Sequence, residues 1–152
     1  MAIITKIEAQ KKNNDRVNIY INDEFFMSVF TELVYTFNLK KGMTIDKDSL
    51  KSLLDNDMYI KAKNKALNIL SKADQSEKKI REKLSSDFED STIDKVLTFL
   101  KDNKFIDDNL LAQKIVNTNI NLNKCGKNKI KQNLYNKGID LESISEAISN
   151  ID

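Results

Sequence analysis

The chain has 152 residues, of which 40% are hydrophobic and 32% charged, and its formal net charge is +2. It contains no run of about 20 apolar residues that could span a bilayer, and its N-terminus has no signal-peptide pattern. A single cysteine excludes an internal disulfide, so we expect a soluble, cytoplasmic protein kept in a reducing compartment.

The first thirty residues have a strand pattern. Apolar side chains alternate with polar ones in three runs, separated by polar segments at 11–15 and 22–24. A period of two is typical of half-buried strands, so the pattern predicts a three-stranded antiparallel meander. A short helix around 33–37 follows, and Gly42 suits the left-handed backbone after it. We assign residues 1–45 to an N-terminal β-stranded segment with a short helix.

The rest of the chain consists of two similar halves. Apolar residues at spacings of three and four predict amphipathic helices, and the pattern recurs after about fifty residues. The first copy comprises Ala62, Ala66, Leu70, Ile80, Leu84, Ile93, Val96, Leu97 and Leu100, and the second comprises Ala112, Val116, Ile120, Ile130, Leu134, Ile144, Ala147, Ile148 and Ile151. The shift is 50 residues in the first two groups and 51 in the third.

We therefore predict a mainly α fold of tandem three-helix repeats, which form an elongated curved array after the small β-meander. The first repeat covers 46–105, including a lead-in helix capped by Asp46 or Asp48, and the second covers 106–152. Whether the lead-in is one bent helix or two stays open. The later helices are expected to begin at Asp74 or Ser76, at Ser91 or Thr92, at Asp107 or Asp108, after Gly126, and at Asp140 or Leu141.

Residues for catalysis are scarce. The chain has no histidine, and its single cysteine therefore lacks the usual partner of a thiolate nucleophile. No glycine-rich phosphate loop or dinucleotide fingerprint occurs. Two acidic clusters, Asp55/Asp57 and Asp87/Glu89/Asp90, could bind Mg²⁺, but solvated helix ends explain them better. We predict a protein that is not an enzyme and has no metal or other cofactor.

Charge is unevenly distributed. Six lysines and no acidic residue lie between Asp108 and Asp140. In a helix over 127–137, Lys127, Lys131 and Tyr135 would form an exposed stripe beside the buried Ile130 and Leu134. Cations recur one repeat earlier, and the candidate binding residues are Lys79, Arg81, Lys124, Lys127, Lys129, Lys131 and Tyr135. Such a row suits a phosphate backbone or an acidic protein groove, although lysine is also an ordinary surface residue of helices.

Several segments resemble a known family. They are Ala66–Leu70, Ser76–Leu84, Val96–Leu100, the run Asn103–Asp108, Leu111–Ala112, and then Gly126, Ile130, Leu134 and Lys137–Ile139. Their order and spacing over about residues 59–148, together with the stranded N-terminal part, resemble the bacterial RecX regulators. Members typically carry arginine where Lys72 stands here, which adds Lys72 to the candidate residues. They also typically have three three-helix units, so with two units Ile144, Ile148 and Ile151 would be less well covered.

The resemblance implies a monomeric inhibitor of the RecA recombinase that acts in recombination and DNA repair. RecX proteins are expected to lie in the groove of the RecA–DNA filament and to reduce ATP hydrolysis and strand exchange, and some also bind DNA directly. Two other hypotheses stay open on the residues alone. One is a helical module that binds single-stranded DNA, and the other is a helical adaptor for some other protein.

Overall fold

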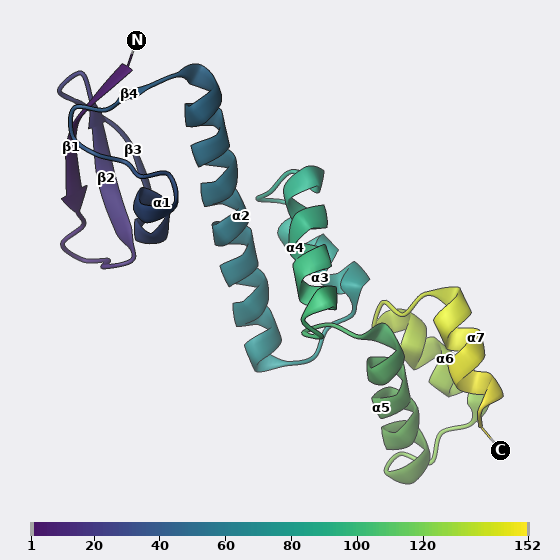
Figure 1. Cartoon of the computed structure of the whole chain (residues 1–152). Helices are drawn as coiled ribbons and strands as arrows, with labels where there is room; N and C mark the ends of the chain where they lie inside the picture. The colour runs from purple at the N-terminus through teal and green to yellow at the C-terminus, as the bar shows by residue number, and fades with distance from the viewer. Residues whose placement is uncertain (1, 152) are drawn as a thin grey trace. The chain divides into compact units, whose positions relative to one another are not determined.

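In the computed structural model, which describes residues 2–151, the chain divides into two units between Lys61 and Ala62 (Figure 1). The first unit contains the β-sheet and the second contains the helical repeats. The helix α2 (Lys47–Lys72) begins in the first unit and ends in the second. None of the helices in the described range has the length and apolar character needed to cross a membrane.

The predicted meander is confirmed. Strands β1 (Ala2–Ala9), β2 (Arg16–Ile21) and β3 (Glu24–Phe30) pair antiparallel in chain order. The turn between β2 and β3 places Asn22 and Asp23 at φ 52° and 67°, the left-handed backbone that twists correctly for a two-residue hairpin. A fourth strand, β4 (Thr44–Ile45), pairs with the start of β1 and completes the order β3-β2-β1-β4. Two residues are too short to produce an alternating pattern, so the sequence did not predict β4.

The core of the first unit lies on one face of this sheet. Val17, Ile19 and Ile21 of β2 are buried, as the alternation predicts. Helix α1 (Thr31–Thr36) adds Leu33, and the first half of α2 adds Leu53 and Ile60. Burial of these aliphatic side chains supplies the main stabilisation of the unit.

A buried ion pair ties α2 to the sheet within the first unit. The Arg16 guanidinium lies 3.1 Å from the Asp57 carboxylate, and both side chains are nearly inaccessible, at 13% and 6%. Arg16 also donates to Ser28, and Asp57 accepts from the backbone N–H of Phe30 at 2.9 Å. The interpretation of Asp57 as part of a solvated helix end is therefore wrong, because its carboxylate is a buried structural acceptor.

Asp57→Ala should destabilise the first unit by about 3–5 kcal/mol, because it leaves the Arg16 charge buried without its partner. Asp55→Ala is the matched control: Asp55 is exposed, two residues away on the same helix, and its loss should change stability by no more than about 0.5 kcal/mol. Thermal and urea unfolding of the three proteins measures this. Equal midpoints for the two variants would contradict the role given to the ion pair.

Helix α2 is one continuous helix, which settles the question left open by the sequence. Asp46 caps it, since its carboxylate accepts from the backbone N–H of Ser49 at 2.7 Å. This hydrogen bond lowers the pKa of Asp46, because it favours the ionised carboxylate.

The second unit contains the two three-helix repeats. The first consists of the C-terminal half of α2, α3 (Glu77–Leu84) and α4 (Asp90–Asp102). The second consists of α5 (Asp108–Asn121), α6 (Lys127–Asn136) and α7 (Leu141–Ser149). The middle helices have the same burial: Ile80 and Leu84 of α3 correspond to Ile130 and Leu134 of α6, and all four are at most 1% exposed. Ile120, expected in the apolar seam near the end of α5, is instead 39% exposed.

Side-chain caps fix where most of these helices begin. Ser76, Asp107 and Asp140 each accept from the backbone N–H three residues on, and each was one of the two alternatives that the sequence offered for its helix start. The predicted start of α4 at Ser91 or Thr92 is late, because the helix already begins at Asp90 with Glu89 at its N-cap. Glu89 makes no side-chain capping bond, so the preference of serine and threonine for N-caps pointed to the wrong residue.

The two repeats meet at Gly138. Its φ of +84° is a left-handed conformation that favours glycine, and a Cβ placed there would lie 2.5 Å from Ser76 Oγ and 3.1 Å from Lys79 Cγ. This glycine lies between α6 and α7, where the shift between the repeats increases from 50 to 51 residues. The absence of a side chain at this position allows the second repeat to approach the start of α3 closely.

Gly138→Ala should destabilise the second unit by about 2 kcal/mol or more, because the methyl group adds backbone strain and a clash with Ser76. Gly126→Ala is the control in the same repeat: Gly126 has φ −77°, and nothing lies within 4 Å of the position that the alanine methyl group would take. The melting temperatures of the two variants measure the difference. A Gly138→Ala protein that melts like wild type would show that the contact with Ser76 is not tight.

Candidate functional site

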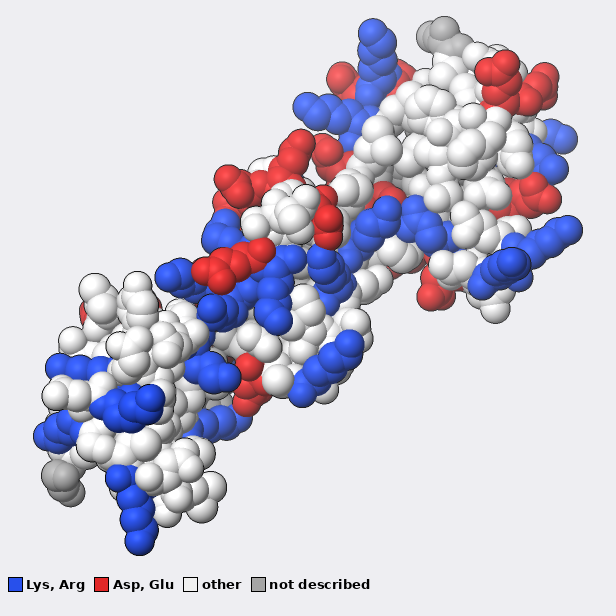
Figure 2. All heavy atoms as spheres, turned by 180° about the vertical axis from the view of Figure 1, so that it is seen from behind, with Lys and Arg blue, Asp and Glu red and all other residues white. Residues whose placement is uncertain are grey.

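Five lysines in and around α6 of the second repeat are exposed and unneutralised. Lys127, Lys129 and Lys131 project from α6, Lys124 precedes it with φ +53°, and Lys137 follows it. No ion pair within residues 2–151 involves any of these five. On the face shown in Figure 2, the part of the chain formed by α5–α7 presents basic side chains and very little acidic surface.

The corresponding cations of the first repeat are neutralised. Arg81 on α3 lies 2.6 Å from the Asp94 carboxylate on α4. One repeat later Lys131 takes the place of Arg81, but Ser145 takes the place of Asp94. Lys131 therefore has no carboxylate at the equivalent position, and its charge is available to a partner.

The same change occurs at two more positions. Lys79 pairs with Glu82 at 3.6 Å, whereas the equivalent Lys129 has Gln132 three residues on. Asp87, which binds Lys65 at 2.6 Å, is replaced by Lys137. The two repeats thus share one apolar framework, but at these three positions the acidic residues of the first repeat are replaced by serine, glutamine and lysine in the second. This difference makes the second repeat the better candidate for binding an anion.

Helix α6 also lacks the usual N-terminal stabilisation. Its N-cap, Gly126, has no side chain to cap the helix, and its first turn contains no acidic residue but carries Lys127 and Lys129. In α3 the same positions are Ser76, which caps the helix, and Glu77. Cations near a helix N-terminus oppose the helix dipole, so an external anion would be favoured there.

The lysines of α6 lie on two sides of the helix. Because each residue turns the helix by about 100°, Lys129 and Lys131 are about 200° apart, one on each side of the buried Ile130 and Leu134. Lys127 and Lys131 share one side. Lys129 shares the other side with Asn133, which lies one turn further along.

Three of the candidate residues lie close to neighbouring structure. Tyr135 is 57% exposed, and Lys78 Nζ lies 5.7 Å from the centre of its ring, so Tyr135 is a contact between the repeats. Lys79 lies against Gly138 at the same junction. Lys72 is exposed in the last turn of α2, where its charge suits the helix C-terminus. These residues and the α6 lysines are therefore spread over the second unit and do not form one row.

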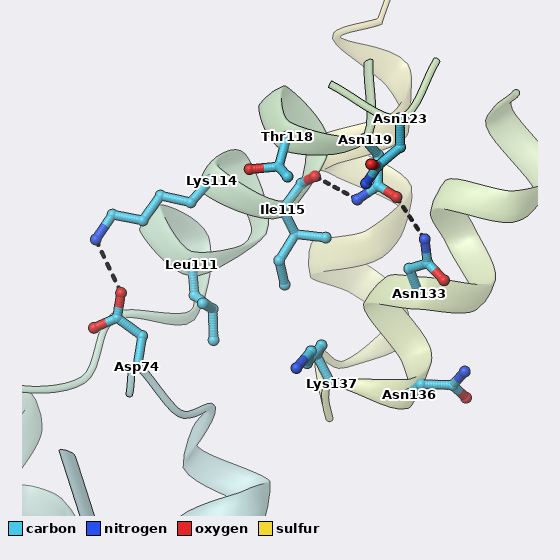
Figure 3. A pocket seen from close by; sticks show the side chains of 10 residues that line it. All are labelled: Asp74, Leu111, Lys114, Ile115, Thr118, Asn119, Asn123, Asn133, Asn136 and Lys137. Carbon is cyan, nitrogen blue, oxygen red and sulfur yellow. Dashed lines mark hydrogen bonds and ion pairs between the residues drawn. The ribbon is translucent and has the colours of Figure 1, made fainter. Parts of the chain in front are cut away.

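An open groove of about 480 Å³, called the amide groove below, lies between α5 and α6 (Figure 3). It is lined by apolar side chains and by several amides, namely Leu111, Lys114, Ile115, Thr118, Asn119, Asn123, Asn133, Asn136, Lys137 and, from the loop before α3, Asp74. The side-chain amide nitrogen of Asn133 donates to the side-chain oxygen of the buried Asn119. The side-chain nitrogen of Asn119 in turn donates to the backbone carbonyl of Ile115. Asp74 is paired with Lys114 at 3.1 Å.

Comparison with known proteins places this arrangement in a family. Residues 2–46 match the regulatory protein RecX N-terminal domain, residues 62–100 match the first three-helix domain of RecX, and residues 107–148 match the second. The chain belongs to the RecX family. The two matched three-helix domains lie within residues 46–105 and 106–152, the ranges predicted for the two repeats.

Individual RecX proteins support this assignment. The chain is 66% identical over 152 residues to a regulatory protein RecX of Clostridioides difficile, covering 100% of this chain and 72% of that protein. It is 44% identical to one of Clostridium acetobutylicum, covering 96% and 68%. A crystal structure of regulatory protein RecX superposes with a TM-score of 0.77 at 32% identity, covering 98% of this chain and 73% of that one. RecX from Lactobacillus salivarius gives 0.59 at 34% identity, covering 62% of each chain.

Sequence reasoning missed the amide groove of this RecX protein. Its lining residues come from two helices and a loop, and asparagines dispersed in a lysine-rich segment carry no recognisable motif. The spacing of Asn133 and Asn136 on α6 was the available signal, because a separation of three residues places side chains on one side of a helix. Within residues 2–151 no group of three or more acidic or cysteine side chains is arranged to hold a metal.

Acidic residues gather instead at the junction of the two RecX repeats. Asp108 Oδ1 accepts the backbone N–H of Glu77 at 3.0 Å, which links the start of α5 to the start of α3. Burial raises the pKa of Asp108. The Glu77 hydrogen bond lowers it, and the nearby carboxylates of Glu77, Asp140 and Asp107 raise it further. The net pKa lies above the ordinary 3.8, so ionised Asp108 opposes folding.

Asp108→Asn should raise the melting temperature at pH 7, because the amide oxygen still accepts from Glu77 and carries no charge. A carboxyl whose pKa is raised by folding stabilises the protein only while it is protonated, and that stabilisation is lost as the pH rises through the folded pKa. The advantage of the variant should therefore shrink as the pH falls to about 3.8 and below. Melting curves across this range test the sign, and a constant difference at every pH would contradict it.

Proposed function

We propose that this RecX protein binds in the groove of the RecA–DNA filament and inhibits ATP hydrolysis and strand exchange by RecA. The observation that carries the proposal is the set of unneutralised lysines on the second repeat. Membership of a family of regulatory proteins supports it, as does the scarcity of catalytic side chains in the sequence. The filament offers both kinds of anion that these lysines would attract, namely protein carboxylates and DNA phosphates.

The first repeat positions the second in this mechanism. Ion pairs such as Arg81–Asp94 neutralise its surface, so it contributes shape and rigidity, whereas α6 presents charge. Lys127 and Lys131 on one side of α6 and Lys129 on the other allow it to contact anions on two sides at once. Binding of this kind would hold adjacent parts of the filament together and oppose the movements that accompany ATP turnover.

The ATPase of RecA on single-stranded DNA tests the proposal. Substoichiometric protein should depress the steady-state rate, and Lys127→Ala/Lys131→Ala should raise the concentration needed for half inhibition about tenfold, equivalent to about 1.4 kcal/mol. The matched control is Lys65→Ala/Lys101→Ala. It removes the same charge from lysines that already pair with Asp87 and Glu77, and inhibition should change less than about twofold.

Two results would contradict the proposal. One is an unchanged ATPase at protein concentrations equal to RecA. The other is equal loss of inhibition in both double variants, which would show that total charge matters and the location of the lysines does not.

A second candidate function is a helical module that coats single-stranded DNA without RecA. The same unpaired lysines favour it, because phosphates are equally good partners for them. About three neutralised phosphates would give a salt slope of roughly −2. Inhibition of RecA that persists in a variant unable to bind DNA would favour the filament, whereas DNA binding without inhibition would favour the coating function.

A further inference from the structure

The groove between α5 and α6 combines an apolar floor with polar amides (Figure 3). Leu111 and Ile115 supply aliphatic surface, while Asn133 and Asn136 lie one helical turn apart on α6. A planar base has the complementary properties, with apolar faces and an edge of mixed hydrogen-bond donors and acceptors. We propose that this groove binds an unpaired base of single-stranded DNA, an inference that rests on the proposed contact between the second repeat and the nucleoprotein filament.

Internal hydrogen bonds set which atoms the two asparagines can offer. Asn133 uses its amide nitrogen to donate to Asn119, so its carbonyl oxygen is left as an acceptor. Asn136 uses its carbonyl oxygen to accept from Gln132 at 3.0 Å, so its amide nitrogen is left as a donor. The lining of the groove on α6 therefore offers one free acceptor and one free donor, and the edge of a base carries groups of both kinds.

Asn119 holds this arrangement in place. It is 5% exposed, and both ends of its amide are engaged, one by Ile115 and the other by Asn133. The acceptor of Asn133 is therefore fixed before any ligand arrives, and little rotamer entropy is lost on binding.

Charge around the groove favours nucleic acid over an acidic peptide. Asp74 is the one carboxylate among the described lining residues, and Lys114 neutralises it at 3.1 Å. Lys137 lines the groove, and Lys129 lies one turn before Asn133 on the same side, so both are placed to meet flanking phosphates. A carboxylate offers acceptors only and would leave the Asn133 oxygen without a donor, whereas a base supplies both.

Fluorescence anisotropy with two oligonucleotides separates base recognition from phosphate binding. An oligothymidylate of about 12 nucleotides is compared with an abasic strand of the same length, without RecA. The wild-type protein should bind the base-containing strand about tenfold more tightly, because burial of the base against Leu111 and Ile115 and its hydrogen bonds to the asparagines add to the phosphate contacts.

Asn136→Ala should abolish most of this preference and leave the salt slope unchanged, because no phosphate contact is lost. Asn128→Ala is the matched control, since Asn128 is an exposed asparagine of the same helix that does not line the groove, and it should keep the tenfold preference. Lys137→Ala should weaken both strands alike and reduce the slope by about 0.7. Because Asn136 is exposed, the variant is expected to fold, which circular dichroism verifies.

Equal affinity for the two strands would overturn the inference, as would a preference that survives in Asn136→Ala. So would an acidic peptide that competes with neither strand but binds in an Asn136-dependent manner, because it would assign the groove to a protein partner. None of these results bears on the ATPase measurement, so the groove and the inhibition of RecA can fail separately.

Discussion

The close approach at Gly138 is the constraint on which the arrangement of the second unit depends. A residue without a side chain, in a left-handed conformation, lets the loop after α6 rest on Ser76 and Lys79 at the start of α3. The Asp108–Glu77 hydrogen bond and the Asp74–Lys114 pair join the same two repeats. Because α6 carries both the exposed lysines and one wall of the amide groove, these contacts determine where its charge and its hydrogen-bonding groups are presented.

The two helical repeats have similar cores but differently charged surfaces. The central apolar positions, such as Ile80 and Leu84 in one copy and Ile130 and Leu134 in the other, are buried alike, so each copy folds around a similar core. The surfaces diverge through a few replacements, such as Asp94 by Ser145 and Glu82 by Gln132. Packing restricts the buried positions strongly and the exposed ones little, so function can be changed on the surface without disturbing the fold.

Much of this fold could be predicted from the sequence, because its determinants are local. The alternation around Val17, Ile19 and Ile21 gave the meander, and the capping residues Ser76, Asp107 and Asp140 gave helix starts. Features that depend on distant partners could not be predicted. In the sequence Asp57 cannot be distinguished from an exposed acidic residue, because its buried partner Arg16 is forty-one residues away. The amide groove likewise exists only once α5 and α6 have packed, so no sequence motif marks its asparagines.

The weak N-terminus of α6 has a thermodynamic consequence. Glycine at the cap, lysines in the first turn and the like charges of Lys127 and Lys131 at i and i+4 all reduce the intrinsic stability of this helix. A polyanion that neutralises them would stabilise the folded second repeat as well as occupy it. Ligand occupancy and local order in this segment are therefore linked, and the part of the molecule that contacts the partner is also the part that gains most rigidity from the contact.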